Sequence, residues 1–271
     1  MEEKLKSYCV TGGTGYIGSW LIKSLLQMGY KVHAAVRHPE KSSHLLKLAE
    51  GSDRLRLFKA DLREEGSFDE AVRSCSGLFH VAAPMEFGVQ ATENVYVLVK
   101  VLTEDAAFQF AKENGIDLVS TITPTVAGPF LTPTVPLSIQ VLLSPITGDP
   151  ELLAILTAVK TRMGSIALAH IEDICHAHIF LMENIKAEGR YICCAKSWTM
   201  PTVIGELKKE YPCPALESLD DEGHDSVIPS EISSKKLRVL GFSFKYEIDD
   251  IIQDTISTCI HHGFIPYNQK S

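Results

Sequence analysis

Short apolar segments alternate with amphipathic ones along the first half of the chain. Strand-length apolar runs occupy 7–11, 31–37, 55–62, 77–84 and 116–124, and the stretches between them, notably 19–29, 67–75 and 93–114, have helical spacing. Strands separated by helices favour a parallel sheet, because parallel strands need long crossover connections. The pattern predicts an α/β fold with a Rossmann-type, doubly wound parallel sheet.

A glycine-rich turn follows the first predicted strand. Gly12, Gly15 and Gly18 lie three residues apart between the strand at 7–11 and the helix at 19–29. In dinucleotide-binding folds such glycines allow a tight turn, a close approach of backbone N–H groups to a pyrophosphate, and close packing of the helix on the sheet. A glycine triplet alone is often an ordinary loop. The flanking strand and helix favour the dinucleotide-binding interpretation.

Arg37 ends the second predicted strand, where folds that bind NAD usually carry Asp or Glu to hold a ribose hydroxyl. A guanidinium suits a 2′-phosphate through paired, charge-assisted hydrogen bonds. The sequence therefore predicts NADP(H) as the cofactor, with Lys41 as a second cation. An ordinary surface arginine is the alternative.

Ligands of such sheets bind beyond the carboxyl ends of the strands. The third predicted strand ends at Asp61 and Leu62, and the fourth ends near Val81, Ala82 and Ala83. We therefore expect these five residues at the edge of the cofactor.

Composition narrows the range of partners. The chain has 271 residues, 45% of them hydrophobic, and a formal net charge of −8. This charge and the lack of Lys- or Arg-rich runs argue against a nucleic-acid partner, and no apolar run approaches the ~18 residues of a membrane span. The seven cysteines show no Cys-x-x-Cys spacing, which favours buried thiols in a reducing compartment. We expect a cytoplasmic protein with a small-molecule substrate; the sequence does not indicate an oligomeric state.

Tyr96 and Lys100 lie four residues apart in the predicted helix 93–114. Residues at i and i+4 share one helix face, so the phenol and the ammonium would point toward the same ligand. Lys100 would lower the pKa of Tyr96 from its usual value of about 10, and Tyr96 would exchange a proton with a carbonyl oxygen. The alternative is structural, because Tyr96 could extend an apolar stripe that we expect to be buried, formed by Val95, Val99, Leu102, Ala106 and Phe110.

Several longer stretches are specific enough to indicate a family. They include VTGGTGYIGSWLIKSLLQMGY at 10–30, FHVAAPMEF at 79–87, YVLVKVLTEDAAFQFAKENGIDLVS at 96–120 and HIEDICHAHIFLME at 170–183. In this order they resemble the plant branch of the extended short-chain dehydrogenase/reductases, the group of dihydroflavonol, anthocyanidin and vestitone reductases and noscapine synthase. The resemblance covers most of the chain.

The resemblance implies roles for particular residues. Tyr96 and Lys100 fall on the family's catalytic Tyr-x-x-x-Lys pair, and the segment Pro124, Thr125 and Val126 falls beside the nicotinamide. We also expect cofactor contacts from the glycine turn, at Thr14, Tyr16 and Ile17. The family pattern further implies an NADP-binding domain at 1–126 and a smaller, mainly substrate-binding subdomain at 127–271, interleaved with the first and beginning with a proline-rich apolar wall at 128–150.

One departure from the family pattern concerns residues 88–95. Between the stretches matched at 79–87 and 96–120, family members carry a helix, a strand and the serine that polarises the substrate carbonyl. A gap one strand wide would leave buried backbone groups unpaired, so we expect the strand at 116–124 to pair directly beside the strand at 77–84. That closure would move the helix of Tyr96 by about 4.8 Å. Thr123 or Thr125 could then replace the serine.

The sequence leaves two function hypotheses open. The first is an NADPH-dependent reductase of a carbonyl or related group on a bulky, flavonoid- or alkaloid-like secondary metabolite. The second is an NADP(H)-binding family member whose turnover was lost with the missing unit. A nucleotide-sugar epimerase or dehydratase shares the fold but usually uses NAD, so Arg37 counts against it. No metal site is predicted, because His170, His176 and His178 lack a zinc spacing.

Overall fold

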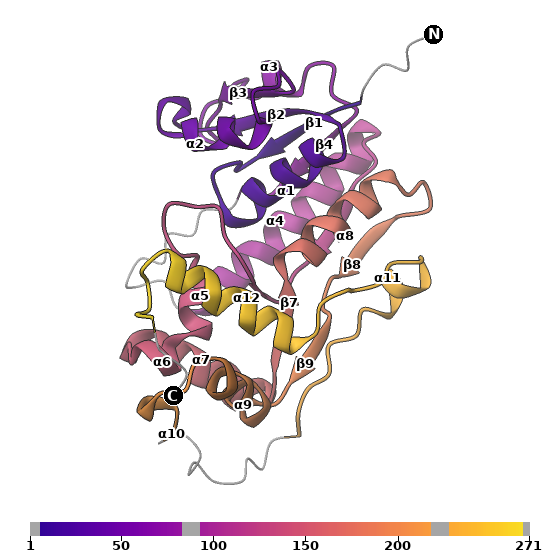
Figure 1. Cartoon of the computed structure of the whole chain (residues 1–271). Helices are drawn as coiled ribbons and strands as arrows, with labels where there is room; N and C mark the ends of the chain where they lie inside the picture. Colours follow the sequence, from indigo (N-terminus) through magenta and orange to yellow (C-terminus); the bar gives the residue numbers. More distant parts are fainter. Residues whose placement is uncertain (1–5, 83–92, 218–227, 268–271) are drawn as a thin grey trace.

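Four parallel strands form the sheet of the N-terminal half. The computed structural model describes residues 6–82, 93–217 and 228–267, with the backbone alone at 41, 43 and 93–97. The strands are β1 (Ser7–Thr11), β2 (Lys31–Val36), β3 (Leu55–Lys59) and β4 (Gly77–His80), in the order β3-β2-β1-β4 (Figure 1). Every neighbouring pair is parallel. The predicted α/β fold with a parallel sheet is confirmed.

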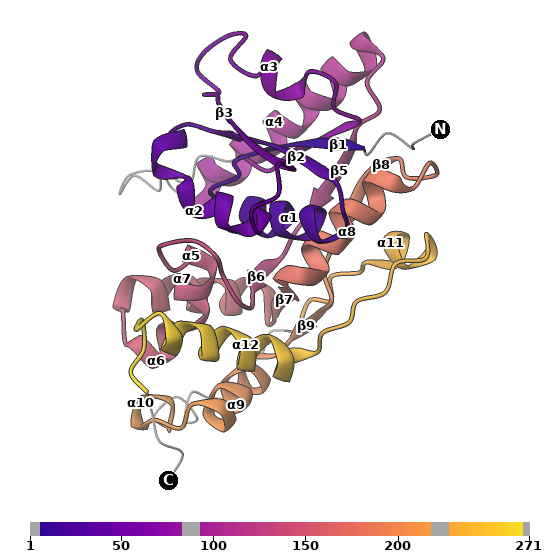
Figure 2. The same ribbon diagram turned by 45° about the horizontal axis from the view of Figure 1, so that its top comes forward.

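Helices cover both faces of this sheet. Helices α1 (Tyr16–Gln27) and α8 (Ile171–Glu183) lie on one face, and α4 (Glu93–Asn114) lies on the other (Figure 2). On the α1 face, Val10, Leu21 and Leu25 are fully buried. Burying each such side chain contributes about 1.5–3 kcal/mol. The short elements between the strands are η1 (Pro39–Lys41), α2 (Ser43–Leu46), η2 (Lys47–Ala49) and α3 (Asp69–Val72).

The second half of the chain adds two smaller sheets. Strand β5 (Val119–Ile122) pairs in parallel with β8 (Gly189–Ile192). Strand β7 (Ile166–His170) lies between β6 (Thr125–Ala127), which is parallel to it, and β9 (Lys196–Trp198), which is antiparallel.

A second apolar core lies at the end of the molecule away from β1–β4 (Figure 1). Leu168, Val203 and Ile251 are fully buried in it. The helices around it are α5 (Leu137–Leu142), α6 (Ser144–Thr147), α7 (Pro150–Met163), α9 (Met200–Glu210), α10 (Pro214–Glu217) and α12 (Ile248–His261), while α11 (Lys235–Val239) lies beside β8.

The first core draws on both halves of the sequence. Ile174 of α8 and Leu237 of α11 are buried in the same cluster as Val10 and Leu25. Elements on each side of residue 126 therefore share one core, and the division into 1–126 and 127–271 stays a prediction.

The expected pairing of β5 beside β4 is wrong. In the described part of the chain β4 pairs with β1 alone, and β5 pairs with β8 alone. The reason is that other elements hold β5: its backbone bonds to β8, and the Thr121 hydroxyl lies 2.7 Å from Nε2 of His178 on α8. The closure of the sheet that the sequence led us to expect is therefore not seen in the described part of the chain.

The apolar stripe of α4 is also not buried as expected. Val99, Leu102 and Phe110 are 51%, 57% and 59% exposed, and Val95 lies outside the described side chains. The helix instead turns another face toward the protein, where Ala111 is buried and Glu104 bonds to Ser120. Leu102 lies about 200° around the helix from Glu104. The stripe therefore faces away from the sheet.

Candidate functional site

The glycine turn begins where β1 ends. Gly12 has a φ of +67°, and its carbonyl oxygen accepts a hydrogen bond of 2.9 Å from the N–H of Gly15. A Cβ at Gly12 would lie 2.8 Å from Cα of Ala82, and a Cβ at Gly18 would lie 2.9 Å from the carbonyl carbon of Gly12. Only glycines allow this turn to lie so close to both β4 and helix α1.

The start of helix α1 is suited to an anion. Its N-cap is Gly15, no side chain caps it, and its first turn holds no acidic residue. The first N–H groups of a helix lack partners within the helix and carry partial positive charge. Thr14 and Gly15 are exposed, while Gly18 is buried against the turn. The turn therefore fits a diphosphate, as the glycine spacing predicts.

Arg37 and an Asp61–Arg63 ion pair lie at the carboxyl ends of β2 and β3. Arg37 directly follows β2 and is exposed. Asp61, just after β3, accepts hydrogen bonds from Arg63, which together with a weaker effect of Arg37 lower the pKa of the Asp61 carboxyl to about 2. Leu62 is 57% exposed. The side chain of Lys41 lies outside the described residues.

A polar cluster joins the ends of β1 and β4. The Oγ1 atom of Thr11 lies 3.0 Å from Nδ1 of His80 and accepts a hydrogen bond of 3.4 Å from the N–H of Ala82. Burial and the charge of Lys100 both lower the pKa of the His80 imidazole, so the Lys100 ammonium lies near the end of β4. The sequence analysis did not identify Thr11 or His80 as site residues. Both end a strand beside the glycine turn, and this position is the signal that could have indicated them.

Tyr96 lies one helical turn before Lys100 in α4, and its side chain lies outside the described residues. Partial burial lowers the pKa of the Lys100 ammonium. Val81 and Ala82 are half-buried after β4, and Ala83 lies outside the described residues. The Tyr–Lys pair and these cofactor contacts stay predictions.

The segment expected beside the nicotinamide connects β5 to β6. Pro124 precedes β6, and Thr125 and Val126 pair with Leu168 and Ala169 of β7. Val126 is buried, and its carbonyl oxygen accepts a hydrogen bond of 2.7 Å from the Ser138 hydroxyl. Thr125 thus belongs to β6, whereas the half-buried Thr123 remains at the end of β5. Their proposed roles beside the cofactor and substrate stay predictions.

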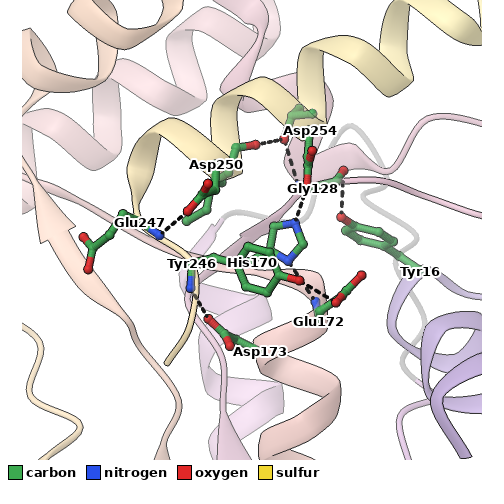
Figure 3. A network of polar contacts seen from close by, with 11 residues as sticks. Tyr16, Gly128, His170, Glu172, Asp173, Tyr246, Glu247, Asp250 and Asp254 are labelled. Atoms are coloured by element: carbon green, nitrogen blue, oxygen red, sulfur yellow. Dashed lines mark hydrogen bonds and ion pairs between the residues drawn. The ribbon is translucent and has the colours of Figure 1, made fainter. Parts of the chain in front are cut away.

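A polar network connects α8, α12 and the loop before α12 (Figure 3). His170 is fully buried, stacks on Tyr246 with ring centroids 3.8 Å apart, and has its Nε2 atom 3.3 Å from Asp254. Burial lowers the pKa of His170, and the nearby Asp254 opposes that shift. The buried Asp173 carboxylate accepts hydrogen bonds from the N–H groups of Lys245 and Tyr246. This network holds the C-terminal helix against β7 and α8.

Tyr16 connects the glycine helix to the same region (Figure 3). Its hydroxyl donates a hydrogen bond of 3.2 Å to the carbonyl oxygen of Gly128, and the N–H of Gly128 donates one of 2.8 Å to the Thr255 hydroxyl. Burial raises the pKa of the Tyr16 phenol well above its usual value. The Tyr16 side chain therefore has a structural role, while Ile17 beside it packs against the first core.

Potential metal ligands do not cluster in the described part of the chain. No group of three or more His, Cys, Asp or Glu side chains in that part of the chain could hold a metal ion. Among the described helices, none is both long and apolar enough to cross a membrane.

Comparison with known proteins decides the family. A bifunctional dihydroflavonol 4-reductase/flavanone 4-reductase of Malus domestica is 34% identical over 333 positions, covering 98% of this chain and 94% of that protein. The dihydroflavonol 4-reductase of Arabidopsis thaliana is likewise 34% identical, over 98% of this chain and 85% of that protein. The chain belongs to the plant dihydroflavonol reductase family. This confirms the resemblance found in the sequence.

Solved structures of two reductases have the same fold as this chain. Vestitone reductase from alfalfa has a TM-score of 0.80 and 29% identity, covering 96% of this chain and 99% of that one. A yeast methylglyoxal/isovaleraldehyde reductase, Gre2, complexed with NADPH has a TM-score of 0.76 at 17% identity, over 95% and 99% of the two chains. The GDP-mannose 4,6 dehydratase family model matches residues 9–102.

The alignments also show that relatives are longer in the matched region. The alignment with the Malus protein has 333 positions and this chain has 271 residues, a difference of 62, so at least that many positions of the Malus protein face gaps.

Proposed function

We propose that this family member is an NADPH-dependent oxidoreductase that reduces a carbonyl or related group of a bulky, flavonoid- or alkaloid-like metabolite. The observation that carries the proposal is the glycine turn, which presents the uncapped start of α1 beside the ends of β1 and β4. The relatives support it, since the Malus, Arabidopsis and alfalfa proteins are named as reductases of dihydroflavonol, flavanone and vestitone.

The residues present fit an NADP(H) cofactor. The N–H groups at the start of α1 would hold the pyrophosphate at the turn formed by Gly12, Gly15 and Gly18. Arg37, exposed at the end of β2, would pair with the 2′-phosphate, where a carboxylate would favour NAD. NADPH supplies hydride when it is bound.

The protein's own part in the reaction is to hold the substrate and to deliver a proton. In this proposal Tyr96 donates its phenolic proton to the substrate oxygen as negative charge develops there. Lys100 lies one turn further along α4, near His80 at the end of β4, and its positive charge would favour the Tyr96 phenolate.

A specific observation favours the second candidate, an NADP(H)-binding protein with impaired turnover. Strands β4 and β5 are not paired in the described part of the chain, and at least 62 positions of the Malus relative face gaps. By the family resemblance the missing unit includes the serine that polarises the carbonyl. Displacements near 1 Å in an active site can already lower rates about 100-fold.

One experiment separates the two candidates. NADPH binding is measured by fluorescence titration, and NADPH oxidation is measured with dihydroflavonol, flavanone and vestitone, for the wild type, Tyr96→Phe and the control Tyr267→Phe, whose side chain is 75% exposed. Turnover lost in Tyr96→Phe alone, with an unchanged Kd for NADPH, supports the reductase. NADPH binding without turnover in the wild type supports the second candidate. Failure to bind NADPH contradicts both.

A further inference from the structure

The turn that follows β3 holds a doubly bonded ion pair. The Asp61 carboxylate accepts a hydrogen bond of 2.9 Å from Nη2 of Arg63 on its Oδ2 atom, and one of 3.2 Å from Nε on its Oδ1 atom. The backbone N–H of Arg63 also donates to Oδ1, over 3.0 Å. The carboxylate and the guanidinium are thus joined by two parallel bonds, an arrangement that fixes the geometry of the pair.

The backbone of this turn is held independently of the ion pair. The Ser67 hydroxyl donates a hydrogen bond of 2.8 Å to the carbonyl oxygen of Asp61 and accepts one of 3.2 Å from the N–H of Asp61. The N–H of Glu64 donates to the same carbonyl oxygen, over 3.0 Å. Removal of the Arg63 side chain would therefore leave the Asp61 backbone in place and its carboxylate without this partner.

Strands β2 and β3 bring Arg37 to the same edge of the sheet. The two strands are parallel, and the N–H of Ala60 donates a hydrogen bond of 3.0 Å to the carbonyl oxygen of Val36. Arg37 and Asp61 are the next residues along the two chains, which lie about 4.8 Å apart in a sheet. Hydrogen bonds from Arg63 are the largest cause that lowers the pKa of Asp61, and the charge of Arg37 adds to the shift. The carboxylate therefore lies within the field of both guanidinium groups.

Asp61 alone would work against an NADP(H) cofactor. Even the ordinary pKa of an aspartate, about 3.9, keeps its carboxylate negative at neutral pH. Unpaired, this charge would attract the Arg37 guanidinium and would repel a 2′-phosphate, which is also negative. A carboxylate at the ribose end of such a site is the arrangement that favours NAD. Arg63 places one positive charge directly on the carboxylate, so the pair adds no net charge beside Arg37.

We propose that Arg63 is a specificity-determining residue, which neutralises Asp61 and so keeps Arg37 available for the 2′-phosphate of NADP(H). This inference deepens the proposed function and rests on it. Arg63 acts through Asp61 and not through a contact of its own with the cofactor. The preference for NADP(H) over NAD(H) then depends on the combined charge of Arg37, Asp61 and Arg63, and not on Arg37 alone.

The test compares two nucleotides that differ by one phosphate. Binding of 2′,5′-ADP and of 5′-AMP is measured by isothermal titration calorimetry. The ratio of the two Kd values isolates the 2′-phosphate, because the adenine, the ribose and the 5′-phosphate are common to both nucleotides. Arg63→Gln should reduce the preference for 2′,5′-ADP about 3- to 10-fold, a limited loss because water and salt screen exposed charges.

Two further variants separate this role from a direct contact and from an effect of net charge. Asp61→Asn combined with Arg63→Gln removes both charges, so the preference should return to within about 2-fold of the wild type. Arg56→Gln is the matched control, because Arg56 is an exposed arginine of the same strand, β3. In an extended chain it lies about 16 Å before Asp61, beyond the Debye length of about 8 Å, and its loss should leave the preference unchanged.

Three results would overturn the proposal while the wild type prefers 2′,5′-ADP. An unchanged preference in Arg63→Gln would show that the charge of Asp61 does not act on the phosphate. A double variant as weak as Arg63→Gln would show that Arg63 contacts the phosphate itself. An equal loss in Arg56→Gln would show an effect of net charge alone. A wild type that binds both nucleotides equally would instead contradict NADP(H) as the cofactor, so failure of the proposed function is recognised separately.

Discussion

Replacing Gly18 by alanine tests whether the close contact at the glycine turn positions α1. Both Gly18 and Gly205 lie inside helices, where alanine is normally more stable than glycine by about 0.5–1 kcal/mol. A Cβ at Gly205 meets nothing within 4 Å. A Cβ at Gly18 would lie 2.9 Å from the carbonyl carbon of Gly12 and 3.0 Å from Cα of Gly13, and closer still to the Gly12 carbonyl oxygen.

These neighbours are backbone atoms, so the helix or the turn must move. Overpacking of this kind costs about 1–3 kcal/mol, which exceeds the gain in helix propensity. We therefore expect Gly18→Ala to lower the free energy of unfolding by about 1–2 kcal/mol and Gly205→Ala to raise it by about 0.5–1 kcal/mol. Because the turn also aims the N–H groups of α1, Gly18→Ala should raise the Kd for NADPH at least 10-fold.

The assay combines urea unfolding, followed by circular dichroism, with fluorescence titration of NADPH for both variants. The reasoning is refuted if Gly18→Ala is as stable as Gly205→Ala, or if it binds NADPH like the wild type. Loss of stability with unchanged NADPH binding would show that the turn supports packing but does not hold the cofactor.

Three further predictions concern charged side chains. Asp173→Ala should lower the free energy of unfolding by about 2 kcal/mol in urea titrations, because it leaves the N–H groups of Lys245 and Tyr246 without their acceptor; an effect equal to that of Asp173→Asn would contradict this. Arg190 holds the pKa of Glu104 below its usual value. The stability that this carboxylate contributes is therefore fully present above the unfolded pKa of about 4.3. It is lost as the pH falls through the lower pKa of the folded state. Wild type and Glu104→Gln should accordingly differ in urea midpoint at pH 7 and converge below about pH 4, and a constant difference would exclude the ion pair as the cause. Arg37→Gln should weaken NADPH binding about 10- to 100-fold and leave NADH binding nearly unchanged, as measured by paired titrations; equal losses for both cofactors would mean that Arg37 does not read the 2′-phosphate.

Local sequence signals were sufficient for the parallel sheet and the glycine turn. The strands β1 to β4 are short apolar runs with helices between them, and Gly12 meets the backbone of Ala82 so closely that a side chain is excluded. Such features depend on residues near one another in sequence or on a single close approach of the backbone. The hydrophobic pattern and the spacing of the glycines are therefore enough to predict them.

The pairing of β5 was not predictable in the same way. The expectation that it would lie beside β4 considered the cost of unpaired edges, but β8, which begins about 70 residues later, is its actual partner. The same applies to the stripe of α4, because periodicity identifies an apolar face without saying what covers it. Leu102 and Phe110 are exposed since Glu104, on another face, bonds to Ser120 and Arg190.

Several functional contacts also depend on long-range geometry. Asp173 lies in the first turn of α8, and its carboxylate accepts hydrogen bonds from backbone groups more than 70 residues away. Thr11 and His80 are brought together by the pairing of β1 with β4. A single sequence contains no spacing signal for such pairs, so structure was needed to find them.

The interleaving of the two halves has a consequence for how the chain folds during synthesis. Helix α1 is complete at residue 27, but the helix that packs beside it, α8, begins at residue 171. The hydroxyl of Tyr16 likewise cannot form its hydrogen bond until Gly128, which supplies the carbonyl oxygen, has been synthesised. Contacts of such long sequence separation form late and slow folding. While the ribosome makes the intervening residues, Leu21 and Leu25 lack part of their cover. Until α8 is complete at Glu183, the apolar face of α1 is therefore a surface through which the growing chain can aggregate.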